Sequence, residues 1–254
     1  MSLVFSDTDN NKGIVQMYER ECGFEIGDVS GNTARLKNLT ADVNLALDDF
    51  IQLALSSSGT WQFDDSNHGD YPIITTNLVS GQRDYTFTTD EGGNLILDIY
   101  KVLIAQPDGT YVEIQPVDSQ SQKDTETLTD GQNETGTPTR YDKTANGIFL
   151  DLIPSYNYTN GLKVYINREG NYFTYTDTTK KPGVPGLFHK YFYLKPALDY
   201  ARRNGRSNYA QLQKEVMDME GDERLNITGT IVDYFASRTK DETPRLTPAW
   251  QNNR

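Results

Sequence analysis

The sequence predicts an α+β protein: a helical bundle formed by both chain ends, with an inserted antiparallel β-sandwich or barrel-like module. Apolar residues recur at helical spacing up to Leu55 and again after Pro185. Between these points, short alternating runs are separated by Gly, Pro, Asn and Asp, which is typical of strands. The expected domains are helical for residues 1–57 and 185–238 and β for residues 58–184, followed by an extended tail over residues 239–254.

Two helices are expected before the β region. Asn and Asp residues near position 10 can cap a first helix, and Gly23 can end it in a left-handed conformation. A second helix is expected to begin near Asn38 or Thr40, because one apolar stripe then runs from Leu39 to Leu55.

Seven short strands are expected in the β domain. The segment Pro107-Asp108-Gly109 predicts a hairpin turn, because proline presets φ and glycine accepts the left-handed position. The pairs Asn146-Gly147 and Asn160-Gly161 predict further turns. The strands are expected at Ile73–Asn77, Arg83–Thr88, Leu95–Ala105, Tyr111–Pro116, Thr139–Asp142, Gly147–Leu152 and Leu162–Asn167, the last with a possible continuation to Tyr175.

Residues 118–137 are nearly devoid of apolar side chains. Such a segment buries too little surface to offset the entropy of ordering it. We therefore expect a long exposed loop, or an arm that becomes ordered only against a neighbouring molecule.

Two helices are expected after the stiff segment Lys181–Gly186. The first presents a wide apolar face, contains Pro196 and ends at Asn204-Gly205. The second is expected to run without interruption from Ser207 to Phe235, although Gly221 weakens it.

The composition excludes several classes of protein. The formal net charge of −12 argues against a protein that grips nucleic acid, because phosphate binding needs a basic surface. The single cysteine, Cys22, permits no disulfide within the chain. No signal peptide or membrane span is expected, so we expect synthesis in a cytosol-like compartment and no membrane contact.

Candidate catalytic and metal sites are weak. Asp7, Asp9 and Asn11 begin like a calcium loop, but Lys12 stands where that loop requires glycine. One loop holds the acidic and imidazole side chains of Asp64, Asp65, His68 and Asp70. A metal-dependent hydrolase at this loop ranks below a simple Asx-rich turn. We expect neither enzyme activity nor a cofactor or metal.

Exposed aromatic residues leave a second function open. A row of aromatic rings on the β module would suit sugar binding by a module for host attachment, although strand packing explains the same pattern. The candidate residues are Tyr156, Tyr158, Tyr172, Phe173 and Tyr175.

Several segments together resemble the head-to-tail connector (adaptor) proteins of tailed bacteriophages. The resemblance covers roughly residues 40–238 and lies in Trp61–Pro72 (WQFDDSNHGDYP), Lys163–Arg168 (KVYINR), Tyr172-Phe173, Lys181–His189 (KPGVPGLFH) and a helix that ends at Ala201–Arg203.

This resemblance implies a ring of identical subunits, a dodecamer, in the neck of the virion. The ring would bind the portal protein above and a tail tube or nozzle protein below. Double-stranded DNA would pass through its lumen without sequence-specific binding.

Two sets of residues are expected to contact partners. The tail has an apolar anchor and no core of its own, so Leu246, Pro248 and Trp250 are expected to insert into a neighbour or the portal. The cations Arg202, Arg203 and Arg206 are expected at contacts with other subunits or the portal, while carboxylates line the lumen.

Overall fold

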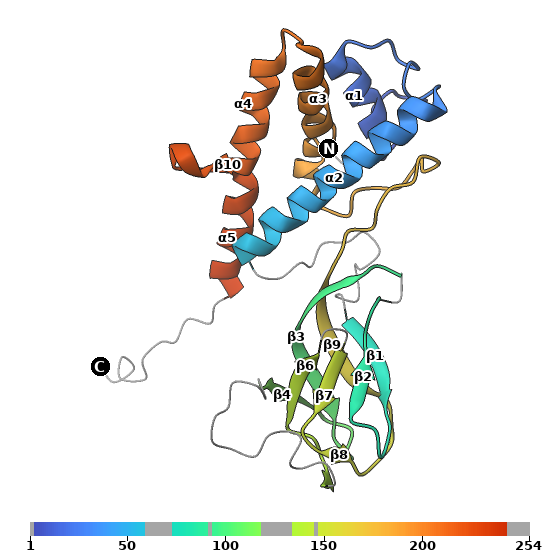
Figure 1. The fold of residues 1–254 in the computed structure, drawn as a ribbon, viewed down its shortest axis with the longest axis vertical. Coiled ribbons are helices and arrows are strands. Elements are labelled where there is room, and N and C mark those ends of the chain that lie inside the picture. Colours follow the sequence, from blue (N-terminus) through green and yellow to red (C-terminus); the bar gives the residue numbers. More distant parts are fainter. Residues whose placement is uncertain (1–2, 59–72, 91–92, 118–133, 145–146, 243–254) are drawn as a thin grey trace, which may run out of the picture. The chain divides into compact units, whose positions relative to one another are not determined.

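The computed structural model describes residues 3–58, 73–90, 93–117, 134–144 and 147–242 (Figure 1). It has both helices and a sheet, which confirms the α+β class. The chain divides into two compact units. One contains residues 1–66 and 170–254 and is called the helical unit; the other contains residues 67–169 and is called the β unit.

The described part of the helical unit contains five α-helices. They are α1 (Ile14–Cys22), α2 (Thr33–Ser58), α3 (Tyr191–Asn204), α4 (Tyr209–Glu220) and α5 (Thr230–Glu242), with a 3₁₀ turn, η1 (Gly186–Phe188), before α3. Helix α1 packs against α3, and α2 packs against both α3 and α5. Helices that precede the β unit in the sequence therefore pack against helices that follow it.

A glycine ends helix α1, and an asparagine caps the start of helix α2. Gly23 ends α1 with a φ of 71°, as predicted. Helix α2 begins at Thr33, earlier than predicted, because Asn32 supplies the cap. The Asn32 side-chain oxygen accepts hydrogen bonds from the backbone N–H groups of Ala34 (3.1 Å) and Arg35 (3.2 Å).

The prediction of one continuous helix from Ser207 to Phe235 is wrong. A small excursion over residues 221–229, called the hairpin, separates α4 from α5. It contains β10 (Gly221–Asp222), the 3₁₀ turn η2 (Glu223–Leu225) and β11 (Ile227–Thr228). Gly221 has a φ of 91°, and a Cβ atom on Gly229 would lie only 2.2 Å from the Glu220 carbonyl carbon. The two glycines thus permit the turn out of α4 and the close return.

The core of the helical unit contains a cluster of aromatic rings. The Phe50 ring from α2 lies 5.6 Å from the Phe188 ring, 5.7 Å from that of Phe192 and 5.9 Å from that of Phe235. All four side chains are buried. The contact surface of α2 is therefore filled by residues that follow the β unit in the sequence.

Residues 170–184 belong to the helical unit rather than to the expected β domain. Gly170 lies so close to α2 that an added Cβ would meet the Leu47 side chain at 2.6 Å. The buried Phe173 ring stacks on the Phe5 ring at 4.7 Å. The last long strand accordingly ends at Arg168 and does not continue to Tyr175.

The β unit contains one seven-stranded sheet whose strands correspond to the seven predicted ones. The strand order is β1-β9-β3-β4-β6-β7-β2. The strands are β1 (Ile73–Leu78), β2 (Asp84–Thr86), β3 (Ile96–Ala105), β4 (Tyr111–Pro116), β6 (Arg140–Thr144), β7 (Gly147–Leu150) and β9 (Tyr158–Arg168). Two short strands, β5 (Thr135–Gly136) and β8 (Ile153–Pro154), pair separately.

The sheet is mixed, so the antiparallel prediction holds for every neighbouring pair except one. Strands β4 and β6 run parallel, because a long connection rather than a tight hairpin leads from Pro116 to Arg140. The predicted turn at Asp108-Gly109 is confirmed: Gly109 has a φ of 90° and its N–H donates to the Gln106 carbonyl at 2.9 Å.

The predicted turn at Asn160-Gly161 is wrong. Both residues lie within β9, where Asn160 has a φ of 55° and the register against β1 shifts between Thr76 and Leu78. The left-handed residue therefore produces a bulge in a continuous strand.

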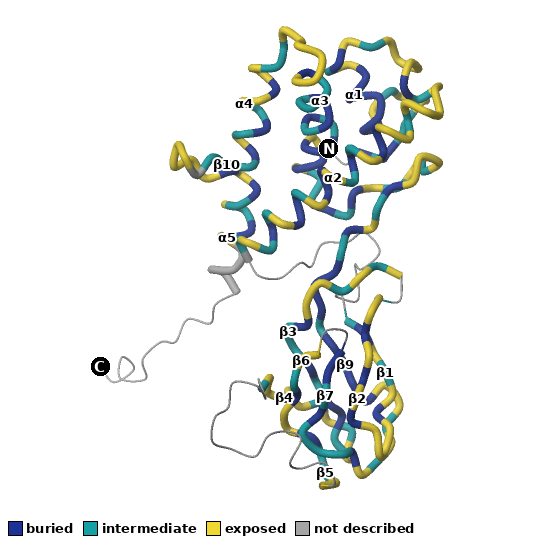
Figure 2. Tube along the Cα trace, viewed as in Figure 1, coloured by how far each residue is buried: buried dark blue, intermediate teal, exposed yellow. Residues whose placement is uncertain are grey.

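The β unit has one apolar core, and Figure 2 shows buried residues along the strands of its sheet. It contains Ile74 from edge strand β1 and Tyr85 from the opposite edge strand β2, together with residues of every strand between them. Because residues from both edges share one cluster, the sheet curls around its core as a half-barrel (Figure 1).

Candidate functional site: a groove in the helical unit

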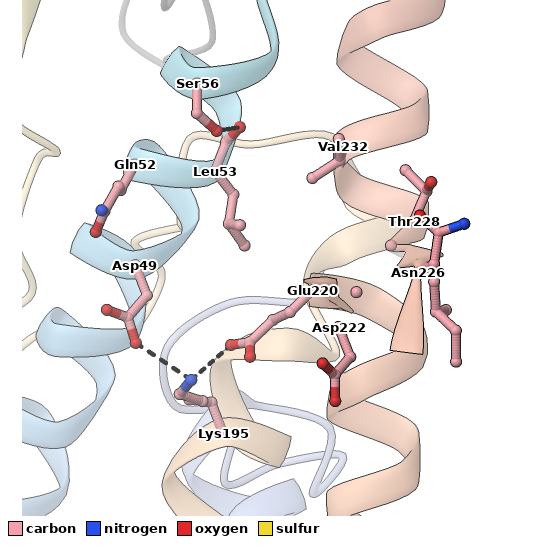
Figure 3. Close-up of a pocket in the computed structure, with 13 residues that line it drawn as sticks. Asp49, Gln52, Leu53, Ser56, Lys195, Glu220, Asp222, Asn226, Thr228 and Val232 are labelled. Atoms are coloured by element: carbon pink, nitrogen blue, oxygen red, sulfur yellow. Dashed lines mark hydrogen bonds and ion pairs between the residues drawn. The ribbon is translucent and has the colours of Figure 1, made fainter. Parts of the chain in front are cut away.

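A groove of about 660 Å³ opens on the helical unit between α2, α3 and the hairpin (Figure 3). Its lining residues are Asp49, Gln52, Leu53 and Ser56 of α2, Lys195 of α3, Glu220 of α4, residues 221, 222 and 226–229 of the hairpin, and Val232 of α5. The four residues of α2 follow the spacing i, i+3, i+4, i+7, which places them on one face of the helix.

Three charged side chains from three helices meet in the groove. The Lys195 ammonium lies 2.6 Å from Glu220 Oε1 and 3.3 Å from Asp49 Oδ2, between the two carboxylates (Figure 3). The Tyr191 hydroxyl donates to the same Glu220 oxygen at 2.5 Å. This network fixes the ends of α3 and α4 against the middle of α2.

The network shifts the pKa of two groups. Burial lowers the pKa of Lys195, but the hydrogen bond and charge of Glu220, with the charge of Asp49, outweigh it and raise that pKa overall. Burial, and then the Glu220 charge, raise the pKa of the Tyr191 hydroxyl. Near neutral pH, Lys195 is thus held as a cation and Tyr191 as a neutral donor.

The groove carries more negative than positive charge. Asp222 accepts a hydrogen bond from the Arg224 backbone N–H at 2.8 Å. Within the described ranges, no cation pairs with Asp222. Lys195 balances only one of the two carboxylates beside it, so the groove favours a cationic occupant.

Apolar surface accompanies this charge. The hairpin exposes Ile227 (48%) and Leu225 (61%), and Ile227 lines the groove with Leu53 and Val232. An exposed apolar tip beside a charged groove is typical of a docking surface.

The described residues contain no group of three or more His, Cys, Asp and Glu side chains placed to hold a metal. Asp7 of the calcium-like segment accepts a hydrogen bond from the Asn10 backbone N–H at 3.0 Å, as in a simple turn. The loop with Asp64, Asp65, His68 and Asp70 lies outside the described residues.

The predicted docking arginines lie away from the groove, around the end of α3. Each contacts its own chain. Arg202 pairs with Asp199 at 2.9 Å, Arg203 lies 3.6 Å from Asp42, and Arg206 donates to the Tyr200 hydroxyl at 3.1 Å. The Tyr200 hydroxyl raises the pKa of the Arg206 guanidinium. The first two arginines keep 65% and 60% of their side-chain surface exposed. The tail residues Leu246, Pro248 and Trp250 lie outside the described residues.

The five aromatic candidates for sugar binding are divided between the two units. Tyr156 and Tyr158 belong to the β unit, while Tyr172, Phe173 and Tyr175 belong to the helical unit. The Tyr156 hydroxyl donates to the Ala105 carbonyl at 2.7 Å, and Phe173 is buried. The Lys37 ammonium lies over the Tyr175 ring, 4.7 Å from its centroid.

Sequence reasoning missed the groove. Its charged residues are far apart in the chain, and their meeting depends on how α2, α3 and α4 pack. One signal was available: Lys195 interrupts the apolar face of α3 directly before Pro196. A cation at that position needs a partner from another element.

Comparison with models of known protein families and with curated proteins gives no match for this chain. In the described part of the chain, no helix combines the length and apolar character that a bilayer crossing requires.

Proposed function

We propose that this chain is a structural protein of a tailed-bacteriophage virion: a head-to-tail connector that forms a ring in the neck. The helices of both chain ends form one bundle in this proposal, and the β unit is inserted into it. It joins the portal protein to a tail tube or nozzle protein and encloses part of the DNA channel. Its role is structural rather than enzymatic, and it is made in the host cytoplasm before assembly.

The observation that carries the proposal is that the helical core combines residues from both sides of the β insertion. Buried residues on both sides of the insertion share one cluster, in which Phe50 contacts Phe188 and Phe235. This arrangement leaves residues 67–169 as a separate compact unit. It fits the order of segments by which the sequence resembles the connector proteins.

Charge supports a conduit rather than a DNA-binding protein. The chain carries 36 acidic and 24 basic residues. Carboxylates facing the lumen would repel the duplex, whereas a lysine-rich lumen would bind it tightly at low salt. The exposed Arg202 and Arg203 side chains remain our candidates for contacts between subunits or with the portal.

Sugar binding by a host-attachment module is the alternative, and the dispersal of its five candidate aromatic residues over two units supports it poorly. It is tested by glycan binding of the purified chain. Binding that is lost in Tyr156→Ala would favour this alternative over the connector.

The connector proposal is tested on purified particles. We expect mass spectrometry to detect the chain in virions, and labelled antibody to mark the junction of head and tail. Absence from virions, or label on fibres only, would contradict the proposal.

A further inference from the structure

We propose that the groove of one copy binds residues 243–254 of a second copy of this chain. This contact goes beyond the proposed function, because it requires self-association of the chain but not a position in a virion. Three features of the groove and of this segment support it.

The first feature is charge. Residues 243–254 (TPRLTPAWQNNR) contain Arg245 and Arg254 and no acidic residue. The groove holds three carboxylates against the single ammonium of Lys195, and Asp222 has no cation beside it within the described ranges. A basic segment and an acidic groove complement each other.

The second feature is the apolar part. Ile227 of the hairpin is 48% exposed and lines the groove with Leu53 and Val232. The segment supplies Leu246 and Trp250 in an otherwise polar sequence. A tryptophan that enters an apolar pocket beside a charged rim is a common anchor at interfaces.

The third feature is the point at which the segment leaves the helical unit. The groove lies at the start of α5, near Gly229 and Val232, whereas the segment follows Glu242 at the other end of that helix. The axial distance between Val232 and Glu242 is roughly 15 Å. To occupy its own groove, the chain would have to reverse immediately after α5.

The sequence after α5 opposes such a reversal. Pro244 and Pro248 each favour an extended conformation in the residue before them. Eight residues lead from Glu242 to Trp250, a reach of roughly 27 Å when extended. An extended chain carries Trp250 away from α5 and so favours delivery to an adjacent copy, whereas the chain's own groove could be reached only if the chain turned back.

Disulfide trapping between two differently tagged full-length chains tests the contact. One chain carries Gln52→Cys in the groove, and the other carries Ala249→Cys beside Trp250. We expect a cross-link between the two chains under mild oxidation. The native Cys22 is buried and serves as an unreactive background. The matched control replaces the exposed Lys214 of α4, outside the groove, by cysteine.

Variants and a binding measurement complete the test. In sedimentation equilibrium, Trp250→Ala should raise the dissociation constant on the order of 30-fold. Asp222→Asn should raise it about 3-fold, because an exposed ion pair contributes little. Gln251→Ala, in the same segment, should leave it unchanged.

Three results would overturn the proposal: equal cross-linking at Lys214→Cys, no effect of Trp250→Ala, or a disulfide confined to one chain when both cysteines are on it. Circular dichroism of each variant excludes loss of folding as the cause. Detection of the chain at the virion neck would be unaffected by these results, so failure of this contact is distinguishable from failure of the connector proposal.

Discussion

The helical unit and the β unit assemble their cores from different parts of the chain. The helical core is built around Phe50, Phe188, Phe192 and Phe235, which come from both sides of the insertion. The β core is mainly aliphatic, and its residues come from one continuous stretch of chain. In the helical unit, a few large rings therefore join segments from either side of the insertion, whereas in the β unit many aliphatic contacts join strands of one continuous stretch. We infer that the helical unit is more sensitive to a single truncation.

The two units also bury carboxylates in different ways. In the β unit, Asp90 pairs with the Arg168 guanidinium, and both are nearly buried. In the helical unit, Glu19 is fully buried, and within the described ranges no cation pairs with it. It accepts hydrogen bonds from the backbone N–H groups of Gly27 (3.2 Å), Val29 (2.8 Å) and Ser30 (2.8 Å). Glu19 thus stabilises a loop, and Asp90 stabilises strand ends.

Among the variants that distinguish the two units, Phe50→Ala should have the largest effect on stability. It removes the ring at the centre of the helical core and should destabilise the helical unit by about 3–5 kcal/mol. Native-state hydrogen exchange should show faster exchange in α2, α3 and α5 but not in the β strands. Leu45→Ala, at a 63% exposed position of the same helix, is the matched control. Equal loss of protection in both units would show that they unfold together.

Asp90→Asn should have the next largest effect, confined to the β unit. It removes the charge of Asp90 from the buried pair with Arg168 and should destabilise that unit by about 3 kcal/mol. Urea unfolding measures the change. The control is Asp98→Asn, which breaks the exposed pair with Lys143 (3.0 Å) and should change stability by about 0–1 kcal/mol. A similar loss in both variants would contradict our account of the buried pair.

Glu19→Gln should have a smaller effect, located in the loop before α2. In glutamine, an amide nitrogen replaces one of the carboxylate oxygens that accept hydrogen bonds from several N–H groups. We therefore expect the free energy of unfolding to fall by about 2 kcal/mol. Exchange of the Val29 and Ser30 amide protons should become faster. Glu25→Gln, at an exposed position of the same loop, should change stability by less than about 0.5 kcal/mol. Unchanged exchange at Val29 in Glu19→Gln would refute this role for Glu19.

Lys195→Met should have the smallest effect on stability, and the effect should depend on pH. The Lys195 pKa is raised in the folded chain, so its stabilisation is complete below the unfolded value of about 10.4 and is lost as pH rises through the folded value. At pH 8, the free energy of unfolding of the wild-type chain should exceed that of Lys195→Met by about 1 kcal/mol. The difference should shrink above about pH 10.5. A difference that grows with pH would contradict this sign.

Local signals predicted much of the fold. The seven strands, the turn at Gly109 and the end of α1 at Gly23 each follow from a few adjacent residues. The hairpin was missed because helical periodicity continues through residues 221–229, and only the backbone conformation of Gly221 reveals the break. Burial of Glu19 and the meeting of Lys195 with Glu220 depend on packing between elements, which no local pattern specifies. The sequence therefore offered only Lys195, a cation on the apolar face of α3, as a signal of the candidate groove, whereas the partner-docking segments were inferred from composition.

A reconstruction of the intact particle tests the connector proposal most directly. Our account predicts a closed ring of this chain between portal and tail, with carboxylates lining the lumen and with Arg202 and Arg203 at contacts outside it. Location of the chain away from the neck would contradict the proposal. A ring in the neck with a lysine- and arginine-rich lumen in contact with the DNA would contradict the conduit.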